Sequence, residues 1–249
     1  MKICNLASGS SGNCTYIETE KYKILIDLGK TKKYITEKLN SIGVDCKDID
    51  YVFLTHTHDD HTSAIRTLLK NHKAKLVITQ KMFMELKDID NLNIIVYEDD
   101  PNIEGLDVKS YKMSHDTGDT RAFVITENSS SLVYITDTGY VNSRYFKSFK
   151  GKTAYFIESN HDVEMLTHGP YPEWLQKRVL SDVGHLSNKF AGMFACIALR
   201  RISKTKGNPR PKNRLTGSRR ISLEQRLANV NIFMVSPPLQ SLQMRFQSH

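Results

Sequence analysis

One stretch, from Tyr51 to His61, limits what this chain can fold into more than any other part of the sequence. It runs Tyr-Val-Phe-Leu-Thr-His-Thr-His-Asp-Asp-His, an apolar segment followed by three histidines and two aspartates. The segment Tyr51–Leu54 is too short for a helix and rich in β-forming residues, and helical periodicity resumes only at Ile65. We therefore predict a buried strand whose carboxyl end opens into a polar loop ahead of a helix.

The polar side chains of this loop are of the types that bind metals. Neutral imidazoles and carboxylates are ligands of zinc and other first-row metals, and a loop allows residues two apart, such as His56 and His58, to converge. Asp60 and His61 are adjacent and must point elsewhere, which indicates two metals side by side. The alternative is a polar helix start, in which an aspartate or Thr62 caps the helix. The density of histidines favours the metal site.

Composition is that of a globular protein and limits the class further. The chain has 249 residues, of which 39% are hydrophobic and 25% charged, so a single soluble domain is expected. No apolar run approaches the ~20 residues of a membrane span. The N-terminus lacks the apolar region of a secretory signal. We expect a cytoplasmic protein with free cysteines. No membrane partner is expected, and the sequence does not tell whether the protein has protein partners.

The net charge of +8 is unevenly distributed along the chain. Residues 189–249 contain 12 Lys and Arg but a single acid, Glu224, so the preceding part of the chain is net acidic. The overall charge is therefore no guide to nucleic-acid binding by the main domain.

Strands alternate with helices along the first 188 residues, which indicates a layered α/β architecture. Several of the expected strands end in polar residues, and such clusters fit a site along one edge of a sheet. Taken alone, His115 is a weak candidate, and Asp137-Thr-Gly139 is also an ordinary turn. The strands and their polar ends are Leu106–Met113 with Ser114-His-Asp116, Leu132–Thr136 with Asp137-Thr-Gly139, and Tyr155–Ile157 with Glu158-Ser-Asn-His-Asp162.

Two further segments are candidates for supporting roles. Asp27 closes the expected strand Lys23–Gly29, where a buried carboxylate needs a partner, and a bond to a ligating histidine would supply one. The glycine-serine loop from Ser8 to Asn13 is either a tight turn or a small anion-binding nest.

Together these motifs resemble the signature of the metallo-β-lactamase superfamily. The wider pattern is similar to its bacterial WalJ/YycJ-type branch, whose members are cytoplasmic metallohydrolases regarded as DNA exonucleases. The similarity extends over about residues 1–188. It rests on Ala7-Ser-Gly-Ser-Ser-Gly-Asn13, Ser114-His-Asp116, Thr136-Asp-Thr-Gly-Tyr140, Glu158-Ser-Asn-His-Asp162 and Gly184-His-Leu-Ser-Asn188, besides the histidine string itself.

The resemblance implies an αββα sandwich over residues 1–200, with two sheets face to face, helices outside and metals at one edge. It implies that His56, His58 and His115 hold metal one, that Asp60 and His61 hold metal two, and that Asp137 bridges the two divalent ions. The mixed nitrogen and oxygen ligands do not distinguish zinc from manganese.

Two histidines near the end of the matching region need separate treatment. His185 precedes a helix expected from Ser187 or Asn188, where phosphate is favoured, so it is a candidate phosphate contact or proton donor. The alternative for its motif is a capping loop. His161 belongs to a polar cluster but is not predicted to be a metal ligand.

The resemblance ends in the basic part of the chain. In the family a further strand ends in His-Leu-Ser, and its histidine completes metal two. Here no histidine occurs between His185 and His249. We predict a basic, poorly ordered tail over residues 201–249, which leaves the sandwich incomplete at its C-terminal end. The tail is either a disordered basic arm or, as we prefer, a segment translated in a different frame.

The resulting hypothesis is a metal-dependent hydrolase, most simply a phosphodiesterase and DNA exonuclease that uses a metal-bound hydroxide at a dinuclear site. Asp60 and His185 would be its catalytic residues and DNA its substrate. One alternative is a small-substrate hydrolase that cleaves a lactam, thioester or phosphoester. Another is a truncated or frame-shifted copy that binds metal without catalysis.

Overall fold

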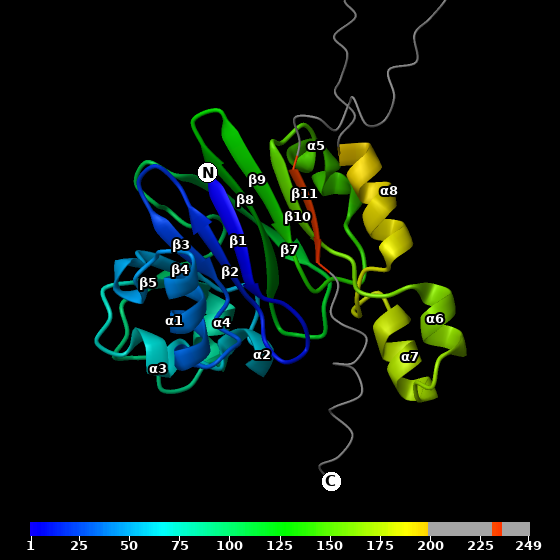
Figure 1. Ribbon diagram of the computed structural model, residues 1–249. Helices are drawn as coiled ribbons and strands as arrows, with labels where there is room; N and C mark the ends of the chain where they lie inside the picture. The colour runs from blue at the N-terminus through cyan, green and yellow to red at the C-terminus, as the bar shows by residue number, and fades with distance from the viewer. Residues whose placement is uncertain (199–230, 236–249) are drawn as a thin grey trace, which may run out of the picture.

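The computed structural model describes residues 1–198 in full and 231–235 as backbone. Two mixed β-sheets pack face to face in this part of the chain (Figure 1). The first sheet has the order β1-β2-β3-β4-β5-β6, with β1 (Lys2–Ala7), β2 (Cys14–Glu18), β3 (Lys23–Ile26), β4 (Tyr51–Phe53), β5 (Lys75–Thr79) and β6 (Ile94–Tyr97). The second has the order β11-β10-β9-β8-β7, with β7 (Asp107–Met113), β8 (Thr120–Glu127), β9 (Ser130–Ile135), β10 (Ala154–Glu158) and β11 (Asn231–Val235).

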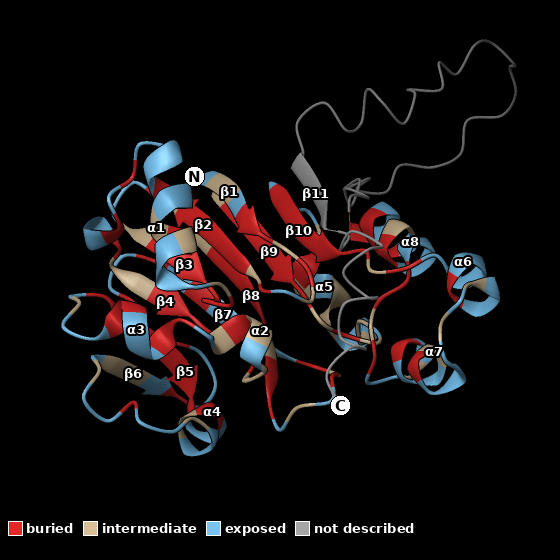
Figure 2. Cartoon of the chain, turned by 60° about the horizontal axis from the view of Figure 1, so that its bottom comes forward, coloured by how far each residue is buried: buried red, intermediate tan, exposed pale blue. Residues whose placement is uncertain are grey.

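Helices cover the outer face of each sheet, and their exposed sides face solvent (Figure 2). The first sheet is accompanied by α1 (Lys32–Ser41), α2 (Asp59–Thr62), α3 (Ile65–Leu69) and α4 (Gln80–Glu85). The second is accompanied by α5 (Phe146–Phe149), α6 (Val163–His168), α7 (Glu173–Leu180) and α8 (Asn188–Ala198). Short 3-10 turns occupy Cys46–Asp48 and Ser143–Tyr145.

Alternation along the strands produces separate cores on the two faces of each sheet. In β3, Ile24 and Ile26 belong to the core between the sheets, whereas Leu25 packs with the helices outside. Phe53 and Phe123 meet edge to face across the sheets with ring centroids 5.4 Å apart. The layers are therefore helix, sheet, sheet, helix, and the predicted αββα sandwich is confirmed.

The strands that carry the polar motifs all end at one edge of the sandwich. β3 and β4 are parallel neighbours in the first sheet, and β9 and β10 are parallel neighbours in the second. At this edge a backbone hydrogen bond joins the two sheets, from the Arg121 amide to the Thr55 carbonyl at 2.8 Å. Residues far apart in sequence, from Asp27 to Glu158, therefore follow strands that end in one region.

The predicted tail contains one strand that the structure describes. β11 lies within it and pairs in parallel with β10, with Ala154 opposite Asn231. Its sequence, Asn-Ile-Phe-Met-Val, is β-forming and covers an edge that β10 would otherwise leave open. The remainder of the predicted tail lies outside the described residues.

Smaller differences concern the helices. Asp60 and His61 are in the short helix α2, not in a loop as predicted, because the chain turns into a helix directly after His58. α6 was not predicted, since it is only six residues long and carries little apolar periodicity. Among the described helices, none has both the length and the apolar character needed to cross a membrane.

Candidate metal centre

Three histidines from the two sheets meet at the shared edge of the sandwich. His56 and His58 follow β4 and His115 follows β7, and one ring nitrogen of each lies within 4.8 Å of the others. The ring centroids of His58 and His115 are 5.2 Å apart. The Nδ1 of His115 is 3.0 Å from the Gly184 carbonyl oxygen, to which it can donate. The structure thus brings together the residues predicted to hold metal one.

His56 provides a test of whether these residues suit a metal. Its side chain is buried, its Nδ1 lies 3.0 Å from the Thr55 hydroxyl, and its Nε2 has no hydrogen-bond partner within the described part of the chain. Burial lowers the pKa of His56 well below its ordinary value, so the ring is neutral. A buried, neutral and unpartnered ring nitrogen is what a divalent metal requires. The residues therefore fit the predicted cofactor.

A second group of donors lies beside the first. His56, His61 and Asp137 have ligand atoms within 4.8 Å of one another. His61 Nε2 is 3.2 Å from Asp137 Oδ2 and 3.8 Å from Asp60 Oδ2. Although burial acts to lower the pKa of His61, the neighbouring Asp27 and Asp137 raise it well above its ordinary value. Metal binding here would therefore displace a proton.

Asp27 orients His61 from behind. Its Oδ2 lies 2.8 Å from His61 Nδ1, which directs Nε2 of the same ring toward Asp137. The Thr55 amide and hydroxyl also donate to Asp27, at 2.8 and 3.0 Å. The predicted bond between Asp27 and a candidate ligand is confirmed. Thr55 was missed, although its position directly before His56 was the available signal.

His185 belongs to a third group, with His115 and Asp137. Its Nδ1 is 2.6 Å from Glu158 Oε1 and 3.4 Å from Asp137 Oδ1. Burial acts to lower the pKa of His185, but Glu158 raises it to about 9. The capping role falls to Ser187 instead, whose hydroxyl accepts from the Phe190 amide at the start of α8. Glu158 was part of a predicted polar cluster, but its bond to His185 was not predicted.

The glycine-serine loop packs against the start of α2. The Asn13 amide donates to the Asp60 carbonyl at 2.8 Å, and Asn13 Nδ2 lies 2.9 Å from His61 Nε2. A Cβ on Gly29 would stand 1.6 Å from the Asp60 carbonyl oxygen, so glycine is required for this close approach. The loop positions the ligand-bearing helix, and its role as an anion nest stays a prediction.

A carboxylate that was not predicted to have a role lies next to the first histidine group. Asp116 Oδ1 is 3.2 Å from His115 Nε2 and 3.5 Å from His58 Nε2. Its other oxygen accepts from Arg178 of α7, at 2.8 Å from Nε. The motif Ser114-His-Asp116 contained the signal, but the arginine that completes the contact lies 62 residues further along the chain.

His161 is separate from the three groups of possible ligands. It is buried, and both of its ring nitrogens are without hydrogen-bond partners within residues 1–198 and 231–235. Burial lowers the pKa of His161 to about 4. The groups of possible metal ligands found among the described residues do not include it.

The fold, the clustered histidines and the aspartate between them define a metallohydrolase class. The model of the metallo-beta-lactamase superfamily matches residues 7–185, and the chain belongs to this superfamily. The chain is 35% identical over 196 residues to the exodeoxyribonuclease WalJ of Streptococcus pneumoniae, which covers 76% of this chain and 73% of that protein. It is 33% identical over 194 residues to the exodeoxyribonuclease YycJ of Bacillus anthracis, with 76% and 74% covered.

Solved structures share the fold at lower sequence identity. The short form of human tRNase Z has a TM-score of 0.63 at 14% identity and covers 80% of this chain and 89% of its own. YhfI of Bacillus subtilis has a TM-score of 0.58 at 19% identity, with 77% of each chain covered. The chain is thus a homologue of exodeoxyribonucleases with the fold of metallo-β-lactamases and His/Asp groups suited to divalent metals.

Proposed function

We propose that this protein is a metal-dependent phosphodiesterase that removes nucleotides from DNA ends and that it works with two divalent ions. The observation that carries the proposal is Asp137, which lies between the donor groups and is shared by two of them. His56, His58 and His115 would hold one ion, and Asp60 and His61 the other, with Asp137 common to both. The two exodeoxyribonuclease relatives support DNA as the substrate. A cytoplasmic location is part of the same proposal.

The ions, zinc or manganese, would lower the pKa of a bound water and stabilise charge on the phosphoryl oxygens. The protein's own residues have the remaining tasks. Asp27 and Thr55 orient the rings of His61 and His56 and keep the proton on the inner nitrogen. Asp60 would supply a carboxylate to the second ion, and its Oδ2 lies 3.8 Å from His61 Nε2.

His185 is the proposed proton donor to the leaving oxygen. Its bond to Glu158 keeps the ring protonated at neutral pH, because the carboxylate stabilises the imidazolium. It is partly accessible, with 17% of its side chain exposed, and it lies 3.4 Å from Asp137. A protonated group beside the shared ligand is suited to general acid catalysis on a phosphodiester.

The missing histidine of the family is the main challenge to this proposal. The sequence contains no histidine between His185 and His249, so the second ion would have Asp60, His61 and Asp137 as its protein ligands. We expect the first ion to be held more tightly than the second. A protein that binds metal without catalysis remains the competing hypothesis, and no contact among the described residues favours a lactam or thioester substrate.

The test combines the metal content of the purified chain with cleavage of end-labelled duplex DNA in zinc or manganese. We expect stepwise loss of nucleotides from the end, and loss of this activity in His58→Ala and His185→Asn. His168→Ala is the matched control, because His168 is exposed on α6 and belongs to none of the three groups. One bound ion and intact DNA under every condition would refute the proposal.

A further inference from the structure

Helix α7 presents one of its faces to the candidate metal centre. Residues four apart lie on the same side of a helix, so Trp174 and Arg178 share one face. Leu175 and Val179 are the buried residues of α7 and pack with Leu166 of α6. The face with Trp174 and Arg178 is therefore different from the buried side that packs against α6, and it is not part of the hydrophobic core.

Arg178 connects this face to the metal centre. Its Nε and one terminal nitrogen lie 2.8 and 2.7 Å from Asp116 Oδ2, and Asp116 Oδ1 lies beside the His58 and His115 imidazoles. The guanidinium is thus one carboxylate away from the predicted ligands of metal one. With 43% of its side chain exposed, Arg178 can be reached by a ligand from solvent.

The position of α7 relative to the centre is fixed by backbone contacts. The carbonyl of Val179 accepts from the His185 amide at 3.0 Å, and the carbonyl of Gly184 lies 3.0 Å from His115 Nδ1. A Cβ on Gly184 would stand 2.3 Å from the carbonyl oxygens of both Arg178 and Val179. The C-terminal end of α7 therefore cannot move without disturbing two of the centre's histidines.

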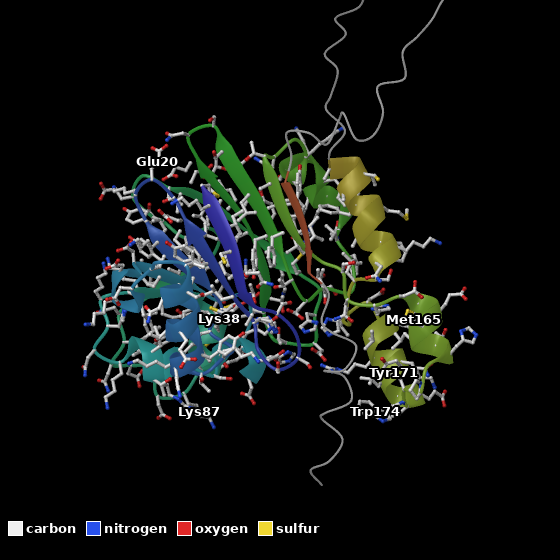
Figure 3. All side chains as sticks on the ribbon, in the orientation of Figure 1. Glu20, Lys38, Lys87, Met165, Tyr171 and Trp174 are labelled. Carbon is white, nitrogen blue, oxygen red and sulfur yellow. The ribbon has the colours of Figure 1, made fainter. Side chains whose placement is uncertain are left out.

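Trp174 lies one turn further from the centre on the same face. The residue is 59% exposed, which is unusual for so large an apolar side chain, and it is the only tryptophan of the chain. Figure 3 shows Trp174 on the α6–α7 pair, and Figure 1 shows that α7 and α2 lie at the same edge of the sandwich. Along this face of α7, Arg178 lies nearer to the metal centre and the exposed ring of Trp174 lies farther from it.

We propose that this face of α7 binds the single-stranded end of a DNA substrate, with Arg178 contacting a backbone phosphate and Trp174 stacking on a base. Phosphate would take the place of Asp116 as the partner of Arg178. Aromatic stacking beside a cation binds single strands without regard to sequence, whereas the bases of a duplex are already stacked on each other. The inference rests on the proposed function and specifies its substrate as an unpaired end.

The sole tryptophan makes a direct test possible. Intrinsic fluorescence of the full chain would be followed in EDTA, which prevents cleavage, while an unlabelled single-stranded oligonucleotide is added, and anisotropy of a labelled copy would report total binding. We expect quenching of Trp174 that saturates with the anisotropy signal, and much weaker quenching by a blunt duplex. Binding without quenching would overturn the inference and leave the nuclease proposal standing. If no DNA bound in EDTA and no DNA was cleaved in zinc or manganese, both the inference and the nuclease proposal would be refuted.

Variants test the two contacts separately. Trp174→Ala should weaken single-strand binding about 5- to 150-fold, the effect of losing one stacked base, with Trp174→Phe retaining part of it. Arg178→Gln should reduce the slope of log affinity against log salt by about 1. The matched controls are Lys177→Ala and Phe190→Ala. The Lys177 side chain is 75% exposed and paired with Glu173, and Phe190 is an aromatic residue of α8 that is 58% exposed. Equal losses in variants and controls would contradict the inference.

Discussion

Asp27 combines an unusual backbone conformation with a buried charge. Its φ is +63°, a left-handed conformation that only Gly, Asn and Asp adopt readily, and its side chain is fully buried against Thr55 and His61. Burial raises the pKa of this carboxyl, and the bonds from His61 and Thr55 oppose that effect. An aspartate at this position therefore does two things. It adopts the left-handed backbone of the turn after β3, and its carboxylate orients the candidate ligand His61.

Replacing Asp27 by Asn separates these two roles. Asparagine tolerates the left-handed conformation and fills the same volume, but it cannot stabilise the His61 ring as the carboxylate does. We expect an intact fold by circular dichroism and about 10- to 100-fold weaker zinc binding in a competitive chelator titration. Asp48→Asn is the control, because that carboxylate pairs with Lys23 at the surface, 50% exposed. Unchanged affinity would show that Asp27 serves only the turn.

The Glu158–His185 pair predicts how the stability of the metal-free protein depends on pH. The folded pKa of His185 is about 9, above the unfolded value of about 6.5. The contribution of His185 to the free energy of unfolding is therefore fully present below pH 6.5. It is lost as the pH rises toward 9, and the loss amounts to at most about 3 kcal/mol. Urea unfolding at pH 6 and pH 9 should show this loss in the wild type and a smaller loss in Glu158→Gln. A pKa of His185 near the ordinary histidine value, measured by NMR titration, would contradict this prediction.

At this scale the local motifs could be predicted and the contacts between them could not. His56, His58 and Asp60 lie within a few residues of one another, so their spacing alone indicates convergence. The bond between Glu158 and His185 joins residues 27 apart, and that between Asp116 and Arg178 joins residues 62 apart. Such pairs depend on how strands and helices pack, which a single sequence does not record.

Among the elements, the turn from α7 into the His185 segment is the most constrained by packing. Gly184 lies against backbone carbonyls and not against side chains that could move aside. We expect Gly184→Ala to destabilise the protein by about 1–3 kcal/mol, as overpacking does, and to weaken zinc binding because His115 is bonded to the Gly184 carbonyl. Denaturant unfolding and a metal titration measure the two effects.

Gly192 provides the matched control for that substitution. It lies within α8, and nothing is found within 4 Å of where its Cβ would be. Alanine there should stabilise the protein by about 0.5–1 kcal/mol, because glycine in a helix interior loses more backbone entropy on folding. If both alanine variants behaved alike, the close approach at Gly184 would not be the cause.

Long periodic elements were predictable, whereas short ones depended on their surroundings. α1 and α7 bury residues that lie four apart, the spacing of a helix face, whereas α6 and β11 were not expected. β11 is stabilised by its pairing with β10 and so by a neighbour about 75 residues away in sequence. Its basic surroundings favoured an irregular tail, and its partner strand is too distant in sequence for the pairing to be expected.

For the whole molecule, the donors of the candidate centre come from both halves of the sandwich. His56, His58 and His61 follow strands of the first sheet, whereas His115 and Asp137 follow strands of the second. This edge is joined by the contact between Arg121 and Thr55 and by the pair of His61 with Asp137. A bound ion would therefore link the sheets as well as complete the site.

Metal binding should accordingly stabilise the entire fold. Zinc at about 100 times its dissociation constant adds about 2.7 kcal/mol, which corresponds to an increase in Tm of about 5–10 °C for a domain of this size. Differential scanning calorimetry with zinc and with EDTA measures the difference. His58→Ala and His115→Ala, one from each half, should both abolish most of the increase, and His168→Ala should retain it. Loss in His58→Ala alone would mean that the first sheet binds the ion without the second, and that the edge is not joined by metal.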